Sequence, residues 1–121
     1  MLKHPAAKIN AQLLAQALKA LSHPKRARIF DLLMEGVHCN CELSKKLGLS
    51  LSLVSHHMRV LEEAGLVNSD HDPHDGRWIY YTVDQEAIRK LVEDIDRFLD
   101  VGRIQPRLPA CGPNRGMGCC P

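Results

Sequence analysis

The sequence predicts a mainly α-helical domain with one small β-hairpin. Apolar residues recur at spacings of three and four in several segments before residue 65 and again after residue 84, which is typical of amphipathic helices. A turn-rich stretch at 70–77 is followed by the β-branched and aromatic run Ile79-Tyr80-Tyr81-Thr82-Val83, which favours a strand. Beyond residue 100 the periodicity ends.

Two helices are expected at the N-terminal end. The first covers residues 11–21, where Leu14, Leu18 and Leu21 share one face. The second begins at Pro24, because a proline is tolerated in the first turn of a helix, and it runs to about residue 35, before Gly36. The expected buried residues of this second helix are Ala27, Ile29, Phe30, Leu32, Leu33 and Met34.

A helix-turn-helix pattern follows. A short helix is expected at residues 40–47, ended by Gly48, and Ser50 is placed to cap a helix at 51–64, ended by Gly65. The joining segment, residues 48–51, has the length of the turn in this motif.

A hairpin and one more helix complete the expected order. Strands at 66–69 and 78–83 form the hairpin, and residues 85–99 form an amphipathic helix. The order ααααββα is that of a winged helix-turn-helix. We therefore expect a DNA-binding and dimerisation domain at residues 1–100 and a flexible, cysteine-containing tail at residues 101–121.

The composition narrows the class of protein. A length of 121 residues suits one domain, and no apolar run approaches the roughly 18 residues that span a bilayer. The N-terminus lacks the apolar core of a signal peptide, so we expect a cytoplasmic protein without a membrane partner. Thiols stay reduced there, which favours metal-binding or redox roles for the five cysteines. No motif pairs a nucleophile with a base, so an enzyme is not expected.

The second helix of a helix-turn-helix enters the major groove of DNA with its N-terminal part. Here that part carries hydroxyl, imidazole and guanidinium groups, which can bond base edges, and lysines and an arginine lie nearby to neutralise phosphates. The expected DNA-binding residues are Ser52, Ser55, His56, Arg59, Lys45, Lys46 and Arg77.

Three segments stand out in order and spacing, and they are Leu21-Ser22-His23-Pro24-Lys25-Arg26, then residues 50–67, SLSLVSHHMRVLEEAGLV, and then Gly76-Arg77-Trp78-Ile79-Tyr80-Tyr81. Together they resemble the ArsR/SmtB family of metal- and metalloid-responsive repressors. The resemblance covers about residues 10–100. It implies a homodimer built from the first and last helices, a palindromic double-stranded DNA operator, and release of that operator when an inducer binds.

The segment Cys39-Asn40-Cys41-Glu42-Leu43 resembles the Cys-x-Cys-Asp-Leu box of the arsenic and cadmium sensors in this family. Both thiols are expected near a helix N-terminus, which favours the thiolate form, and thiolates select soft ions. The arsenic sensors often carry a third cysteine three residues after the second cysteine of the box, where this chain has Ser44.

The tail offers the missing sulfur ligands. Cys111, Cys119 and Cys120 lie on a segment with a reach on the order of 20 Å, which gives an effective concentration of around millimolar at the box of either subunit. The expected metal ligands are therefore Cys39, Cys41, Cys111, Cys119 and Cys120. No histidine follows His74, so the zinc or nickel site that the family places on its last helix is not expected.

The leading hypothesis is a repressor that releases DNA when trivalent arsenic, As(III), or antimony, Sb(III), binds three thiolates. One alternative is a sensor of Cd(II), Pb(II) or another thiophilic cation, which would prefer four ligands. An alternative of another class is a thiol redox sensor, in which an oxidant joins cysteines in a disulfide. The sequence does not show whether His57 faces DNA or the core.

Overall fold

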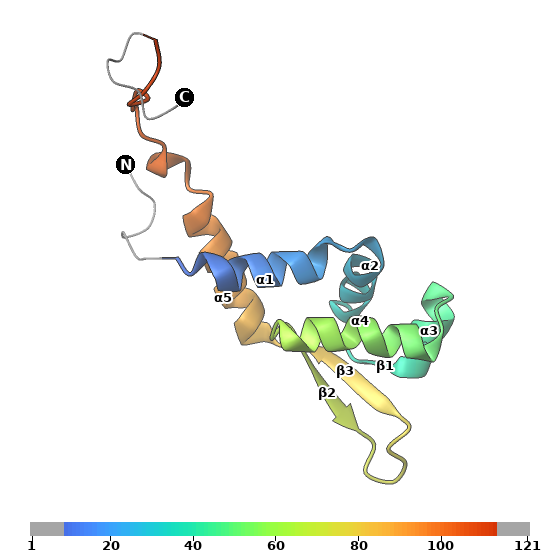
Figure 1. The fold of residues 1–121 in the computed structure, drawn as a ribbon. Helices are drawn as coiled ribbons and strands as arrows, with labels where there is room; N and C mark the ends of the chain where they lie inside the picture. The colour runs from blue at the N-terminus through green and yellow to red at the C-terminus, as the bar shows by residue number, and fades with distance from the viewer. Residues whose placement is uncertain (1–8, 114–121) are drawn as a thin grey trace.

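The computed structural model describes residues 9–113 and has the predicted winged helix-turn-helix architecture (Figure 1). The elements in chain order are α1 (Ala11–Ser22), α2 (Pro24–Leu33), β1 (His38–Cys39), α3 (Asn40–Leu47), α4 (Leu51–Glu63), β2 (Val67–His71), β3 (Ile79–Val83), α5 (Gln85–Phe98) and the short 3-10 helix η1 (Val101–Arg103). No described helix is both long and apolar enough to span a membrane.

Local side-chain chemistry sets the helix starts. The side chains of Asn10, Ser50 and Asp84 each accept a hydrogen bond from the backbone N–H three residues later, at 3.1 Å. The predicted starts of α1, α4 and α5 are thereby confirmed. The predicted end of the second helix was slightly late, because α2 stops at Leu33, and Met34 and Ala27 are exposed instead of buried.

The sheet has a third strand that the sequence did not reveal. Its order is β1-β3-β2, all antiparallel, with His38 opposite Tyr81 and Cys39 opposite Tyr80. A strand of two residues is too short to show alternation, so it is recognisable only from its pairing with β3. The predicted hairpin is confirmed as β2 and β3, which reach away from the helices as a wing (Figure 1).

The core lies between the helices and the near end of the sheet. Its fully buried side chains come from α2, α3, α4 and the segment after α4, and they are Ile29, Leu43, Val54, Met58, Leu61 and Leu66. Because α3 and α4 share this core, the helix that carries the candidate thiols is packed directly against the helix expected to read DNA.

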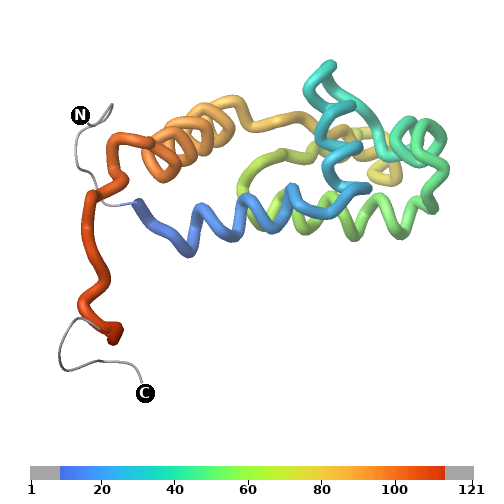
Figure 2. Tube along the Cα trace, turned by 90° about the horizontal axis from the view of Figure 1, so that it is seen from above, coloured from blue at the N-terminus to red at the C-terminus, as the bar shows by residue number. Residues whose placement is uncertain are grey.

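α1 and α5 contact each other and form the end of the molecule away from α3, as the two perpendicular views show (Figures 1 and 2). Residues 104–113 continue from η1 beyond this end. The helical turn η1 was not predicted and interrupts the segment expected to be an irregular tail. Cys119 and Cys120 lie outside the described residues.

Candidate DNA interface and thiol site

The turn between α3 and α4 is held by glycine geometry and one hydroxyl. Gly48 has a φ of 64°, a left-handed conformation that L side chains rarely adopt, and it ends α3. The Leu49 N–H donates to the Ser44 carbonyl at 3.1 Å, and the Ser44 hydroxyl donates back to the Leu49 carbonyl at 2.5 Å. Ser44, which stands where the resemblance to arsenic sensors places a third cysteine, therefore stabilises the helix-turn-helix turn in this chain.

α4 separates its exposed residues sharply from its buried ones. The sequence-predicted base-contacting residues all lie on the exposed face, and they are Ser52, Ser55, His56 and Arg59. They are spaced three, one and three residues apart and so form one stripe along the helix. The opposite face, with Val54, Met58 and Leu61, is fully buried, which fixes the rotation of the helix about its axis.

The predicted phosphate-binding cations lie on α3 and in the wing. Lys45 and Lys46 are exposed on α3, and the Arg77 side chain is 90% exposed in the wing. Arg77 has a partner that the sequence did not reveal, because it forms an ion pair of 2.9 Å with Asp75. This guanidinium lowers the pKa of Asp75, so the pair persists at neutral pH and reduces the free charge of the wing.

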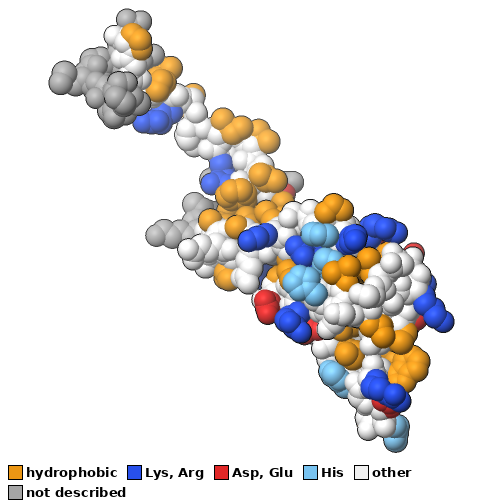
Figure 3. Space-filling model, turned by 45° about the vertical axis from the view of Figure 1, so that its right-hand side comes forward, with side chains coloured by type: hydrophobic (Ala, Val, Ile, Leu, Met, Phe, Trp, Pro, Cys, Tyr) orange, Lys and Arg blue, Asp and Glu red, His pale blue; other side chains and the backbone are white. Residues whose placement is uncertain are grey.

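Two further cations lie beside the helix-turn-helix turn. Lys25 and Arg28, both on α2, line a small hollow of about 150 Å³ together with residues 47–49. Their position was predictable in part, because basic residues crowd the start of this helix in the sequence. Figure 3 shows Lys, Arg and His side chains gathered on one face of the molecule, with few acidic side chains among them.

His57 faces the core, which answers the question that the sequence left open. It is only 3% exposed, its Nδ1 lies 3.3 Å from Arg26 Nη1, and its Nε2 is buried without a hydrogen-bond partner. The His23 and His56 rings lie 4.8 and 5.5 Å from its ring. Burial first, and then the charge of His23 and Arg26, lower the pKa of His57, so it is neutral at pH 7.

The two thiols of the box lie at the junction of β1 and α3. Cys39 is the last residue of β1 and the N-cap of α3, and it is buried with 7% exposure, whereas Cys41 is half-buried in the first turn. The expectation that both thiols lie near a helix N-terminus is therefore confirmed. The Cys39 N–H donates to Glu42 Oε1 at 3.1 Å, and this bond is the main cause of the lowered pKa of Glu42.

His38, beside the thiols, has both ring nitrogens engaged. Its Nδ1 lies 2.9 Å from the Gly36 carbonyl and its Nε2 lies 3.2 Å from Lys46 Nζ. Because a lysine ammonium only donates, Nε2 accepts and Nδ1 carries the proton that it donates to Gly36. His38 therefore fastens β1 to α3 in this structure.

The structure does not bring a third ligand to Cys39 and Cys41. Among residues 9–113, no three His, Cys, Asp or Glu side chains are grouped so that they could hold a metal ion. Cys111 is disulfide-bonded, and the segment after α5 lies at the opposite end of the molecule from α3 (Figures 1 and 2). Ligation by Cys111 would therefore require reduction of this disulfide and either a rearranged tail or a second subunit.

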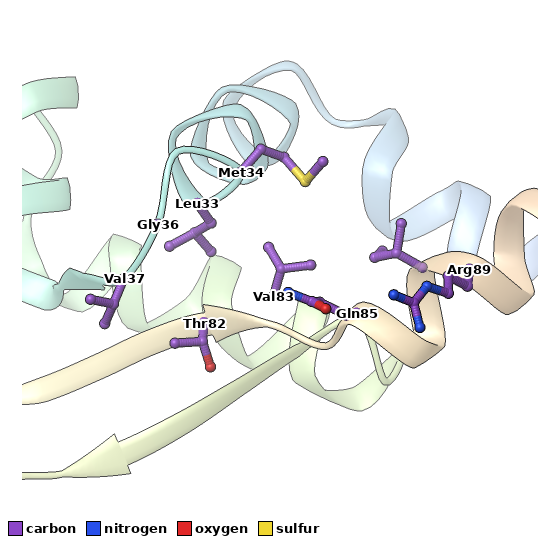
Figure 4. A pocket seen from close by; sticks show the side chains of 9 residues that line it. Leu33, Met34, Gly36, Val37, Thr82, Val83, Gln85 and Arg89 are labelled. Atoms are coloured by element: carbon purple, nitrogen blue, oxygen red, sulfur yellow. The ribbon is translucent and has the colours of Figure 1, made fainter.

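An apolar pocket of about 430 Å³ lies between the end of α2, β3 and the start of α5 (Figure 4). Leu33, Met34, Val37 and Val83 form its apolar walls, and Arg89 stands at one side. Its nine lining residues include no cysteine, histidine or carboxylate, so it lacks the thiolate ligands on which the soft-ion hypothesis rests.

Comparison with known proteins identifies relatives of both the sequence and the fold. The model of the family described as bacterial regulatory protein, arsR family, matches residues 23–69. A Staphylococcus aureus protein named as a homologue of the cadmium resistance regulatory protein CadC is 34% identical over 92 residues, which cover 75% of this chain and 74% of the relative.

Two solved structures resemble this one. A crystal structure described as a possible transcriptional regulator for arsenical resistance has a TM-score of 0.61 at 35% identity, covering 69% of this chain and 83% of that chain. A homodimeric winged helix-turn-helix DNA-binding domain from Mycobacterium bovis has a TM-score of 0.59 at 23% identity, covering 74% and 85%. The latter likeness supports the fold alone.

Proposed function

This chain belongs to the ArsR family of bacterial regulatory proteins and is a DNA-binding transcriptional repressor rather than an enzyme, and we propose that trivalent arsenic bound by Cys39 and Cys41 makes it release its operator. As(III) or Sb(III) is the inducer in this proposal. The observation that carries it is the position of two thiols at the start of the helix that packs against the DNA-reading helix α4.

The burial of Cys39 explains how a bound ion would act on the fold. Cys39 lies opposite Tyr80 in the sheet, and its N–H is bonded to Glu42 at the start of α3. An ion shared with Cys41 has to draw the Cys39 sulfur out of this setting. That movement strains the β1–β3 pairing or the first turn of α3, and α3 shares the buried Leu43 contact with α4.

Three thiolates are needed for As(III), and the box supplies two. We propose that a tail cysteine, among Cys111, Cys119 and Cys120, supplies the third from the same or the partner subunit. A tether of this length supplies an attached thiol at an effective concentration of around millimolar. The disulfide at Cys111 makes this third ligand depend on a reducing environment.

Cadmium is the second candidate inducer, because the Staphylococcus relative is named for cadmium resistance. Cd(II) or Pb(II) would take a fourth ligand, so two tail cysteines would be required instead of one. The number of cysteines needed for the response therefore separates the two inducers.

DNA binding in this proposal uses the exposed stripe of α4. Ser52, Ser55, His56 and Arg59 face the major groove, while Lys45, Lys46 and Arg77 lie against phosphates. Arg77 would exchange its Asp75 partner for a phosphate oxygen.

The operator is palindromic in this proposal because the repressor is a homodimer formed through α1 and α5. Both helices carry exposed apolar side chains, including Leu13, Leu18 and Val92, which a partner subunit would cover. A Mycobacterium bovis domain of the same fold is described as homodimeric. Two subunits related by a two-fold axis read two half-sites of inverted sequence.

The test is a titration of the protein–DNA complex followed by fluorescence anisotropy of labelled DNA, under reducing conditions. The DNA is a duplex selected from a random-sequence library by the ion-free protein. Arsenite should weaken binding of the wild-type protein by roughly 5- to 150-fold, the usual range of such couplings. Cys39→Ser and Cys41→Ser should bind the ion-free duplex as the wild type does and should lose the response.

Each of the other outcomes refutes a part of the proposal. A Cys39→Ser protein that still releases DNA on addition of arsenite would exclude the box as the site. A response to cadmium but not to arsenite would replace the inducer. Release by peroxide without any added ion, with the mass of the protein lower by two hydrogens, would favour the thiol redox alternative.

A further inference from the structure

Asn40, the residue between the two cysteines, joins the thiol site to the wing. Its side-chain amide Nδ2 donates to the Arg77 carbonyl at 3.1 Å, and its Oδ1 lies 3.4 Å from the Ile79 N–H. The same Oδ1 accepts from the Cys41 N–H at 3.0 Å. One side chain therefore contacts the first turn of α3 and two backbone groups, one just before β3 and one at its first residue.

These contacts bridge segments that are far apart in the chain. Asn40 lies 37 residues before Arg77 and 39 before Ile79. Beyond the sheet pairing of Cys39 with Tyr80, they are the contacts that fasten the box to the base of the wing loop. The wing residue Arg77 is also one of the proposed phosphate ligands, so both ends of this link belong to functional parts of the molecule.

We propose that Asn40 is the positioning residue through which ion binding at Cys39 and Cys41 is transmitted to the wing. This inference rests on the proposed function. An ion held by both sulfurs fixes the backbone on either side of Asn40 in a new geometry. The Asn40 side chain then loses its bonds to Arg77 and Ile79, and the wing leaves the position in which it contacts DNA.

The link gives the repressor a second output besides the packing of α3 on α4. The packing route acts on α4 and base contacts, whereas the Asn40 route acts on the wing and phosphate contacts. The second route is open to measurement by itself, because the sole tryptophan of the chain, Trp78, lies between the two residues that Asn40 holds.

The experiment compares Asn40→Ala with the wild type in the full-length protein under reducing conditions. Three quantities are measured: arsenite affinity from thiolate absorbance, affinity for the selected duplex with and without arsenite, and Trp78 emission. In Asn40→Ala we expect arsenite affinity to be retained. The ratio of DNA dissociation constants with and without arsenite should fall at least about 5-fold, because each of the two bonds from Asn40 to Arg77 and Ile79 is worth about that factor.

Trp78 emission separates transmission from a merely structural role. In the wild type, arsenite should shift the emission of Trp78, and in Asn40→Ala the emission should already resemble that shifted state and respond no further. Asn40→Asp keeps an acceptor for Ile79 but loses the donor to Arg77, so its coupling should be intermediate. Asn68→Ala, which removes an exposed asparagine from β2 of the same wing, should behave as the wild type.

Failure of this inference is distinguishable from failure of the proposed function. If wild type and Asn40→Ala release DNA by the same factor, or if Trp78 still responds to arsenite in Asn40→Ala, Asn40 does not transmit the signal, although the thiol sensor stands. If the wild type does not release DNA at all, the proposed function fails. In that case, unchanged amide hydrogen exchange at Ile79 in Asn40→Ala would overturn the structural link too.

Discussion

Acidification from about pH 7.5 to about pH 5.5 should destabilise this protein through His57, and the change His57→Leu should remove that sensitivity. His57 is buried on α4, with its Nε2 unpartnered and its Nδ1 facing the Arg26 guanidinium. A proton on this ring would create a buried charge next to Arg26, Lys25, His23 and His56, all of which carry or can acquire positive charge.

The sign and the size follow from linkage. Burial, and then His23 and Arg26, lower the pKa of His57 in the folded protein below its ordinary value of 6.5. The unfolded chain therefore takes up a proton below about pH 6.5 that the folded chain refuses, so stability is complete above this pH and falls below it. If the folded ring stays neutral, lowering the pH from well above 6.5 to one unit below 6.5 reduces the unfolding free energy by about 1.4 kcal/mol.

The assay is urea unfolding followed by circular dichroism at both pH values. In His57→Leu most of the pH-dependent change in unfolding free energy should disappear. The unfolding free energy at the higher pH should change little, because the buried Nε2 without a hydrogen-bond partner is removed together with the bond to Arg26. His56→Leu is the matched control on the same helix, and this exposed position should keep the wild-type pH dependence. Equal pH dependence in wild type and His57→Leu would refute the reasoning.

The other predictions concern DNA, the inducer and the dimer. Arg59→Ala should cost about 1–3 kcal/mol of specific DNA binding and relax the preference at one base pair, whereas Lys45→Ala should lower the slope of log affinity against log salt by about one, both measured by anisotropy. Ser44→Cys should place a thiol one turn after Cys41, so arsenite should then release DNA even when all three tail cysteines are serine. Val92→Glu should put a charge on the exposed apolar face of α5 and shift the protein to monomers in sedimentation velocity.

Each of these predictions would be contradicted by a specific result. An Arg59→Ala protein with unchanged base preference would remove this residue from base reading. A Ser44→Cys protein that still needs the tail would show that the two positions do not share an ion. Val92→Glu dimers of unchanged affinity would place the dimer interface elsewhere.

Helix boundaries were predictable because their causes are local. Gly48 ends α3 through its own left-handed backbone, and Ser50 starts α4 by a bond to a residue three positions away. The exposed stripe of α4 followed equally from the spacing of Val54, Met58 and Leu61. The same spacing contained a sign that His57 is buried, since it lies three residues after Val54 and four before Leu61.

The contacts around the box were not predictable because they are tertiary. β1 has two residues and is defined only by its partner β3, and Asn40 meets a segment almost forty residues away. The Arg77–Asp75 ion pair is the exception, because the two residues are only two positions apart, and the acidic neighbour was visible in the sequence. A third sulfur ligand was likewise not predictable from the sequence, because it depends on the tertiary position of the segment after α5 relative to the box.

Reciprocal linkage between inducer and DNA tests the central claim most directly. The affinity of the reduced wild-type protein for arsenite is measured with and without a saturating amount of the selected duplex. If the Cys39–Cys41 site and the DNA-bound conformation exclude each other, DNA should weaken arsenite binding by the same factor by which arsenite weakens DNA binding. Equal arsenite affinities for free and DNA-bound protein would contradict the account.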